Sequence, residues 1–183
     1  DDLAYLRDGW DFRNVLLVEQ PNKDWAYTVV RSFLFDVFNY YFFKGLINSK
    51  DLPLASIAQK SLKEITYHLR WSSEWMIRLG DGTEESHNRV SAALADGWMF
   101  SGELTSESDV DMRMNEQGLA PALSAMKSHV DSHVAEVLDE ATLKPPTGAW
   151  MQDGGKDGKH TEHLGYILTE LQFLQRAYPG MQW

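Results

Sequence analysis

Residues 25–47 read WAYTVVRSFLFDVFNYYFFKGLI and are the most apolar stretch of the chain. Their length and hydrophobicity approach those of a membrane-spanning helix. However, Arg31, Asp36 and Lys44 lie within the stretch, and charged groups are unfavourable in the hydrocarbon of a bilayer. We therefore predict a long helix that is buried inside a protein rather than in a membrane. Gln20-Pro21-Asn22-Lys23-Asp24 precedes it as a turn, with Asp24 as the helix cap.

The next segment, residues 54–79, repeats apolar side chains at alternating steps of four and three residues. This heptad-like seam is typical of helices that pack nearly antiparallel in a bundle. Similar patterns predict helices over residues 84–105, 122–140 and 160–178, and we find no convincing alternation of the kind that strands show. The sequence therefore predicts an all-α helical bundle, with residues 1–183 forming one domain.

Composition excludes several classes of function. The 183 residues carry a formal net charge of −10, which argues against a general grip on nucleic acid. The chain contains no cysteine, so disulfides, thiolate metal sites and cysteine nucleophiles are excluded. No signal-peptide pattern is visible at the N-terminus, and a cytoplasmic location fits best.

Polar residues on the predicted apolar faces are the candidates for a site. Asp36 lies in the middle of the stripe on the first long helix, either as a metal ligand or as a structural acid bonded to a neighbour. Glu64 and His68 are four residues apart and flank the next seam. They could act as ligands or as an acid–base pair, or they could form only a hydrogen-bonded pair.

Histidines add to this group. His160 and His163 lie near the start of the last predicted helix and are expected to face inward, where they could bind a metal or hydrogen-bond across the bundle. His133 faces the seam of the 122–140 helix. The faces together predict a polar cluster in one bundle interior, made of Asp36, Glu64, His68, His133, His160 and His163.

The cluster departs from a di-iron carboxylate site. Such a site needs a Glu on each of two helices and a Glu-x-x-His on each of the other two. Tyr67, not a histidine, stands three residues after Glu64, and His160 occupies the Glu place of the last motif. Neutral imidazoles in place of carboxylates remove negative charge that iron needs. We interpret the positions as a vestigial metal site that hydrogen bonds fill: Asp36, Glu64, Tyr67, His68, His160 and His163.

Several blocks of the sequence resemble one known family. The most specific is His160-Thr161-Glu162-His163-Leu164-Gly165. Others are residues 16–22 (LLVEQPN), 63–70 (KEITYHLR), 78–83 (RLGDGT) and 174–180 (LQRAYPG). These blocks are similar to the PaaC family of ferritin-like subunits in the bacterial phenylacetyl-CoA epoxidase complex.

This resemblance implies a ferritin-like bundle with a structural role in a multicomponent oxygenase. A related PaaA-type subunit would hold the di-iron centre, and a reductase subunit would supply electrons from NADPH through flavin, so no cofactor is expected in this chain. The resemblance also implies that Asp36, Glu64, His160 and His163 occupy the iron-ligand places of the catalytic relative, with Tyr67 replacing one histidine. Family members usually begin with a further helical segment before Asp1, so we expect a truncated N-terminus and apolar surface left exposed.

The first long helix carries more aromatic residues than one buried stripe can use. We predict a partner interface that contains Phe35, Phe38, Tyr41 and Phe42. The expected partner is the catalytic di-iron subunit with the rest of its complex, and a homodimer is a further expectation. Two other interpretations remain: a metal-dependent oxidoreductase in its own right, and a ferritin-like protein that only associates with itself.

Overall fold

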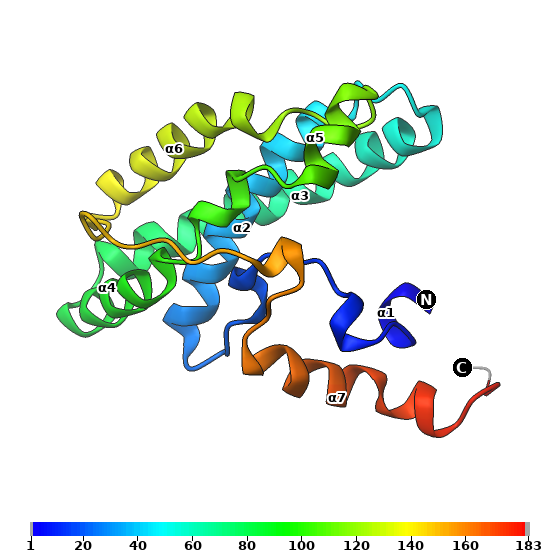
Figure 1. Ribbon diagram of the computed structural model, residues 1–183. Helices are drawn as coiled ribbons and strands as arrows, with labels where there is room; N and C mark the ends of the chain where they lie inside the picture. The colour runs from blue at the N-terminus through cyan, green and yellow to red at the C-terminus, as the bar shows by residue number, and fades with distance from the viewer. Residues whose placement is uncertain (1, 182–183) are drawn as a thin grey trace.

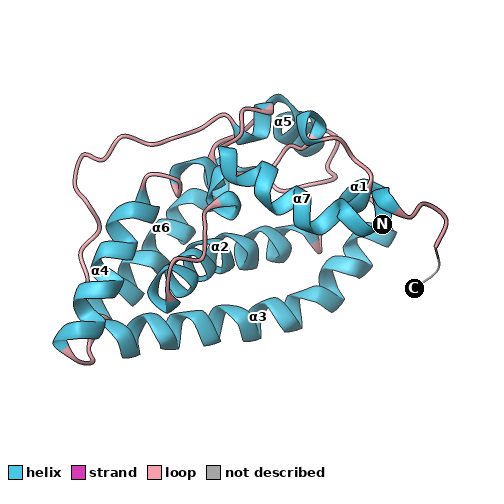
Figure 2. Cartoon of the chain, turned by 90° about the horizontal axis from the view of Figure 1, so that it is seen from below, coloured by secondary structure: helices cyan, strands magenta, loops and turns pink. Residues whose placement is uncertain are grey.

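The computed structural model describes residues 2–181, and every regular element in that range is helical (Figure 1; Figure 2). This confirms the all-α fold class. The long helices are α2 (Trp25–Leu46), α3 (Leu52–Gly80), α4 (Glu84–Trp98), α6 (Leu123–Glu140) and α7 (Glu162–Ala177). The short elements are α1 (Asp2–Tyr5), α5 (Asp109–Glu116) and the 3-10 turns η1 (Gly9–Asp11), η2 (Leu16–Glu19), η3 (Gly102–Thr105) and η4 (Gly155–Asp157).

The helices begin where short polar side chains cap their free amides. Asp24 accepts a hydrogen bond from the amide of Tyr27 at 3.1 Å, and Asp51 accepts one from Leu54 at 2.9 Å. Thr83 starts α4 in the same way, and Ser108 starts α5, a helix that the sequence analysis did not predict. The predicted helix over 84–105 is too long, because α4 ends at Trp98 and the chain turns before η3.

Helix α2 is the centre of the bundle and packs against α3, α4 and α6. Its buried side, with Val29, Phe33 and Val37 fully covered, supplies much of the core. Trp25 at its start meets Trp71 and Trp75 of α3 edge to face, with ring centroids 5.7 Å and 5.5 Å apart. No helix in residues 2–181 combines the length and the apolarity needed to cross a bilayer.

Helix α7 lies beside this bundle rather than within it (Figure 1). It packs against α1, η1 and η2, so only one narrow side of the helix is covered. Leu164, Leu168 and Gln172 are buried there, whereas Phe173 is 61% exposed. An apolar strip of α7 is therefore left on the surface.

One close backbone contact fixes the ends of α3 and α6 against each other. A Cβ atom built on Gly80, the last residue of α3, would lie 2.1 Å from the carbonyl oxygen of Ala141, just after α6. The Gly80 carbonyl oxygen also lies 2.7 Å from Nδ1 of His87 and accepts a hydrogen bond from Thr142 Oγ1 at 3.3 Å. Glycine is required here by the space available.

We predict that Gly80→Ala lowers the free energy of unfolding by more than about 2 kcal/mol, because a backbone carbonyl must move. The matched control is Gly165→Ala in α7, where a Cβ meets nothing within 4 Å. That change should stabilise the protein by about 0.5–1 kcal/mol through helix propensity. Urea unfolding measures both, and equal effects of the two substitutions would refute the contact.

Candidate functional site

Three of the predicted site residues lie on the solvent side of α3. The side chains of Glu64 and His68 are 78% and 54% exposed, with Oε1 and Nε2 3.7 Å apart, and Tyr67 is 57% exposed. The prediction that Glu64 and His68 belong to a bundle interior is wrong. The buried line of α3 runs through Ile65 and Leu69, and a one-position offset on a helix turns a side chain by about 100°.

Asp36 is half-buried on the side of α2 that faces α3. Removal from solvent raises the pKa of its carboxyl above the ordinary value of 3.8, while the Ser72 hydroxyl and the His68 ring act in the opposite direction. Ser72 itself is fully buried. Asp36 therefore lies close to Ser72 and His68 of α3, but burial has a larger effect on its carboxyl than these neighbours do.

A groove of about 490 Å³ separates α2 from α7. Residues 18–22 close one side, and Arg31, Phe35 and Asp36 of α2 line it opposite His163 of α7. The Arg31 guanidinium donates to the Gln20 carbonyl oxygen at 2.6 Å and ties this segment to α2. Asp36 and His163 are thus the members of the predicted cluster that line this groove.

His160 is not part of α7, contrary to the prediction that it shares an inward helical face. It precedes the cap residue Thr161, and its ring reaches across to η2. Nδ1 lies 2.7 Å from Glu19 Oε1, and Nε2 lies 2.9 Å from the Phe12 carbonyl oxygen. Both ring nitrogens therefore have an oxygen partner, and these two contacts fix the orientation of the ring.

Glu19 is the centre of this polar cluster and was missed in the sequence. Its carboxylate is 1% exposed. Oε2 accepts hydrogen bonds from the Thr161 amide at 2.8 Å and the Thr161 hydroxyl at 2.7 Å, and Oε1 accepts from Asn14 Nδ2 at 2.8 Å. The signal in the sequence that could have revealed Glu19 is its position as an acid directly after the apolar residues 16–18. Two blocks that carried the family resemblance therefore meet at one buried carboxylate.

A second buried carboxylate holds the loop before α7. Glu103 is 2% exposed and accepts hydrogen bonds from the amides of Leu16, Gly154 and Lys156 at 2.7, 3.0 and 3.2 Å. A Cβ atom on Gly155 would lie 2.2 Å from the Asn14 carbonyl oxygen, so the two backbones are in direct contact. The amides of this glycine-rich loop are thus directed at a protein carboxylate.

These positions do not fit a two-iron ligand set. Within residues 2–181 no group of three or more His, Cys, Asp or Glu side chains is arranged to hold a metal ion. Glu64 and His68 point to solvent, His160 is bonded to Glu19, and His133 lies beside Tyr41, 3.3 Å from its hydroxyl oxygen. These donor side chains therefore do not converge on one point, and Asp36 and His163 lie apart from them in the groove between α2 and α7.

The fold and its buried carboxylates define a helical-bundle protein whose terminal segments are fixed by hydrogen bonds to acids. The chain belongs to the PaaA_PaaC family, Phenylacetic acid catabolic protein, which it matches over residues 1–183. It is also 41% identical, over 183 residues, to the C subunit of the 1,2-phenylacetyl-CoA epoxidase of Escherichia coli (strain K12). That alignment covers 100% of this chain and 74% of the relative. The family resemblance seen in the sequence is thereby confirmed.

We predict that Glu19→Gln lowers the free energy of unfolding by about 2–4 kcal/mol, because an amide NH₂ group then faces the donors of Thr161, Asn14 and His160. The substitution should also increase the rate of amide hydrogen exchange, and the increase should be larger in α7 than in α4, since Glu19 fixes the start of α7. The control is Glu170→Gln, which makes the same change at an exposed acid of α7. Equal urea-unfolding curves for the two variants would contradict this role.

Asp36 should make stability depend on pH. Its pKa is raised in the folded state, so the folded chain binds this proton more tightly than the unfolded chain does. Stability from this group is present at low pH and falls as pH rises from its ordinary pKa through the raised one. Asp36→Asn should remove that decline, and its stability relative to wild type should increase as pH rises above the ordinary pKa of 3.8.

Urea unfolding at several pH values tests the Asp36 prediction. Asp139→Asn, at an exposed acid of α6, is the matched control for the removal of one carboxyl group. A constant difference between Asp36→Asn and wild type over these pH values would show that the Asp36 carboxyl does not titrate as described.

Proposed function

We propose that this chain is a non-catalytic structural subunit of a multicomponent epoxidase that acts on phenylacetyl-CoA. The dispersal of its metal-donor side chains carries the proposal. Family membership supports the pathway, and the name of the relative supports a place in a multisubunit epoxidase. In this proposal the positions Asp36, Glu64, Tyr67, His68, His160 and His163 are remnants of a metal site, and a partner subunit holds the di-iron centre.

An aromatic row on α2 is the proposed contact for the catalytic subunit. Phe35, Phe38 and Phe42 are half-buried, with centroid distances of 6.2 Å from Phe35 to Phe38 and 5.6 Å from Phe38 to Phe42. The row starts at the groove beneath α7, because Phe35 lines that groove. Large aromatic side chains that stay partly exposed are typical anchors of a subunit interface.

Tyr41 has a different environment from the other predicted interface residues. Its ring centroid lies 5.7 Å from that of His129 on α6. Burial raises the pKa of its hydroxyl and lowers that of the neighbouring His133. Tyr41 therefore joins α2 to α6, and its place in the partner interface stays a prediction.

Phe38→Asp should weaken binding to the catalytic subunit by at least roughly tenfold, because a charge replaces an apolar anchor at the contact. Co-expression of the two subunits followed by size-exclusion chromatography measures the loss. Ile57→Asp, at an exposed apolar residue of α3, is the control and should co-elute normally. Thermal melts confirm that both variants fold. Normal co-elution of folded Phe38→Asp would overturn the interface.

A metal-dependent oxidoreductase is the second candidate function, because Asp36 and His163 line one groove. Iron analysis after anaerobic loading with Fe(II) and desalting separates the two proposals. Essentially no retained iron is the expected result. About two irons per chain, the stoichiometry of a two-metal site, would make this a catalytic subunit.

A further inference from the structure

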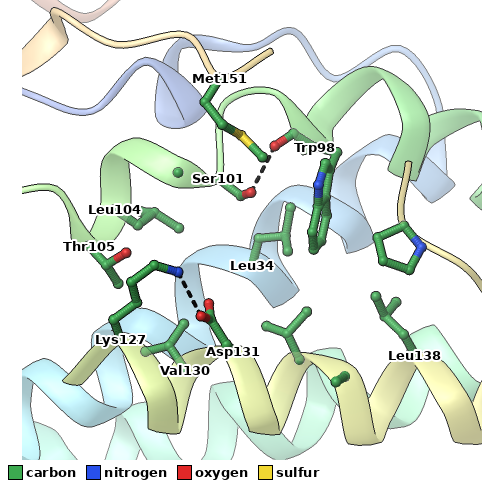
Figure 3. Close-up of a pocket in the computed structure, with 14 residues that line it drawn as sticks. Leu34, Trp98, Ser101, Leu104, Thr105, Lys127, Val130, Asp131, Leu138 and Met151 are labelled. Atoms are coloured by element: carbon green, nitrogen blue, oxygen red, sulfur yellow. Dashed lines mark hydrogen bonds and ion pairs between the residues drawn. The ribbon is translucent and has the colours of Figure 1, made fainter. Parts of the chain in front are cut away.

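A second cavity lies between α2 and α6. It has a volume of about 360 Å³ and is formed by α6, the end of α4, η3 and the loop that carries Pro145 and Met151 (Figure 3). This volume falls in the range of small-molecule sites, about 300–1,000 Å³. Neither Asp36 nor His163 belongs to its lining, so it is separate from the groove beneath α7.

The body of the cavity is apolar. Leu34 comes from α2, Val130, Val134 and Leu138 come from α6, and the Trp98 indole forms a flat wall at the end of α4 (Figure 3). The four aliphatic residues are buried, so their positions are fixed by the core. A wall of this kind favours a planar apolar group that can pack on the indole.

Polar groups are confined to a few positions on the lining. Ser101 Oγ donates to the Trp98 carbonyl oxygen at 2.8 Å and keeps its own oxygen available as an acceptor. The nearly buried Thr105 hydroxyl lies on the same wall. On α6, Lys127 Nζ and Asp131 Oδ2 are 2.6 Å apart, and each side chain is more than half exposed.

The Lys127–Asp131 pair balances the charge at the rim. A bound carboxylate would gain Lys127 but would stand beside Asp131, and a bound cation would meet the opposite conflict. An uncharged polar group avoids both conflicts, since a carbonyl oxygen can accept a hydrogen bond from Thr105 or Lys127. The apolar walls then take the remainder of the ligand.

We propose that this cavity binds a small uncharged aromatic compound that carries one carbonyl or amide group. Benzamide and benzoate are the probes, because they have nearly the same shape and differ in charge. Ligand-observed NMR with titration should give a dissociation constant for benzamide in the range of about 0.1–1 mM, as expected for so small a ligand. Benzoate should bind at least roughly tenfold more weakly.

Two variants and a control test whether benzamide binds in this cavity. Ala135 lines the cavity from an exposed position of α6, so Ala135→Phe should fill the space and abolish saturation transfer to benzamide without unfolding the helix. Ser132→Phe adds the same ring at an exposed α6 position outside the lining and should bind like wild type. Thr105→Val should weaken binding by roughly tenfold through the loss of one hydrogen bond.

Each result decides the proposal. Benzamide binding that Ala135→Phe removes and Ser132→Phe retains supports the site. No binding by the folded wild-type protein at 10 times the upper expected dissociation constant, about 10 mM, would overturn it. Equal binding by the two phenylalanine variants would place the ligand elsewhere. Tighter binding of benzoate than of benzamide would overturn the uncharged class, because Lys127 would then have left Asp131 for the ligand.

Discussion

The buried carboxylate of Glu19 joins the segment before α2 to the start of α7. A carboxyl group at 1% exposure is unfavourable unless its oxygens are fully bonded, and here Thr161, His160 and Asn14 are the partners. The same carboxylate thus caps the start of α7 and fixes η2. Glu103 acts in a similar way. Its carboxylate accepts hydrogen bonds from three backbone amides that belong to segments far apart in sequence.

These two acids explain why irregular chain can cover one side of a helical bundle. Residues 8–24 and 144–161 contain few helical hydrogen bonds, so their amides need other partners. Carboxylates provide strong acceptors at fixed points, and contacts between glycine and backbone, as at Gly155, bring the segments close enough to use them. The polar interior is therefore bonded to the backbone, whereas a metal site would need several of these side chains directed at one point.

The arrangement also separates two surfaces with different chemistry. The aromatic row of α2 and the groove beneath α7 present large, half-exposed rings. Between α2 and α6, a smaller cavity has aliphatic walls and a charge-balanced rim. A fixed bundle can support both because α2 supplies a residue to each, Phe35 to the groove and Leu34 to the cavity.

The sequence alone determined the helical class, the positions of α2, α3 and α6 to within about two residues, the usual uncertainty of helix ends, and the family. Periodicity and capping residues act locally, so Asp24 and Thr83 mark helix starts without knowledge of the fold. Tertiary structure decided which side chains share a site. Glu64 and His68 differ from buried Ile65 and Leu69 by one position each, and one position turns a helical side chain by about 100°. The bond between Glu19 and His160 joins residues 141 positions apart, a separation that no local pattern spans.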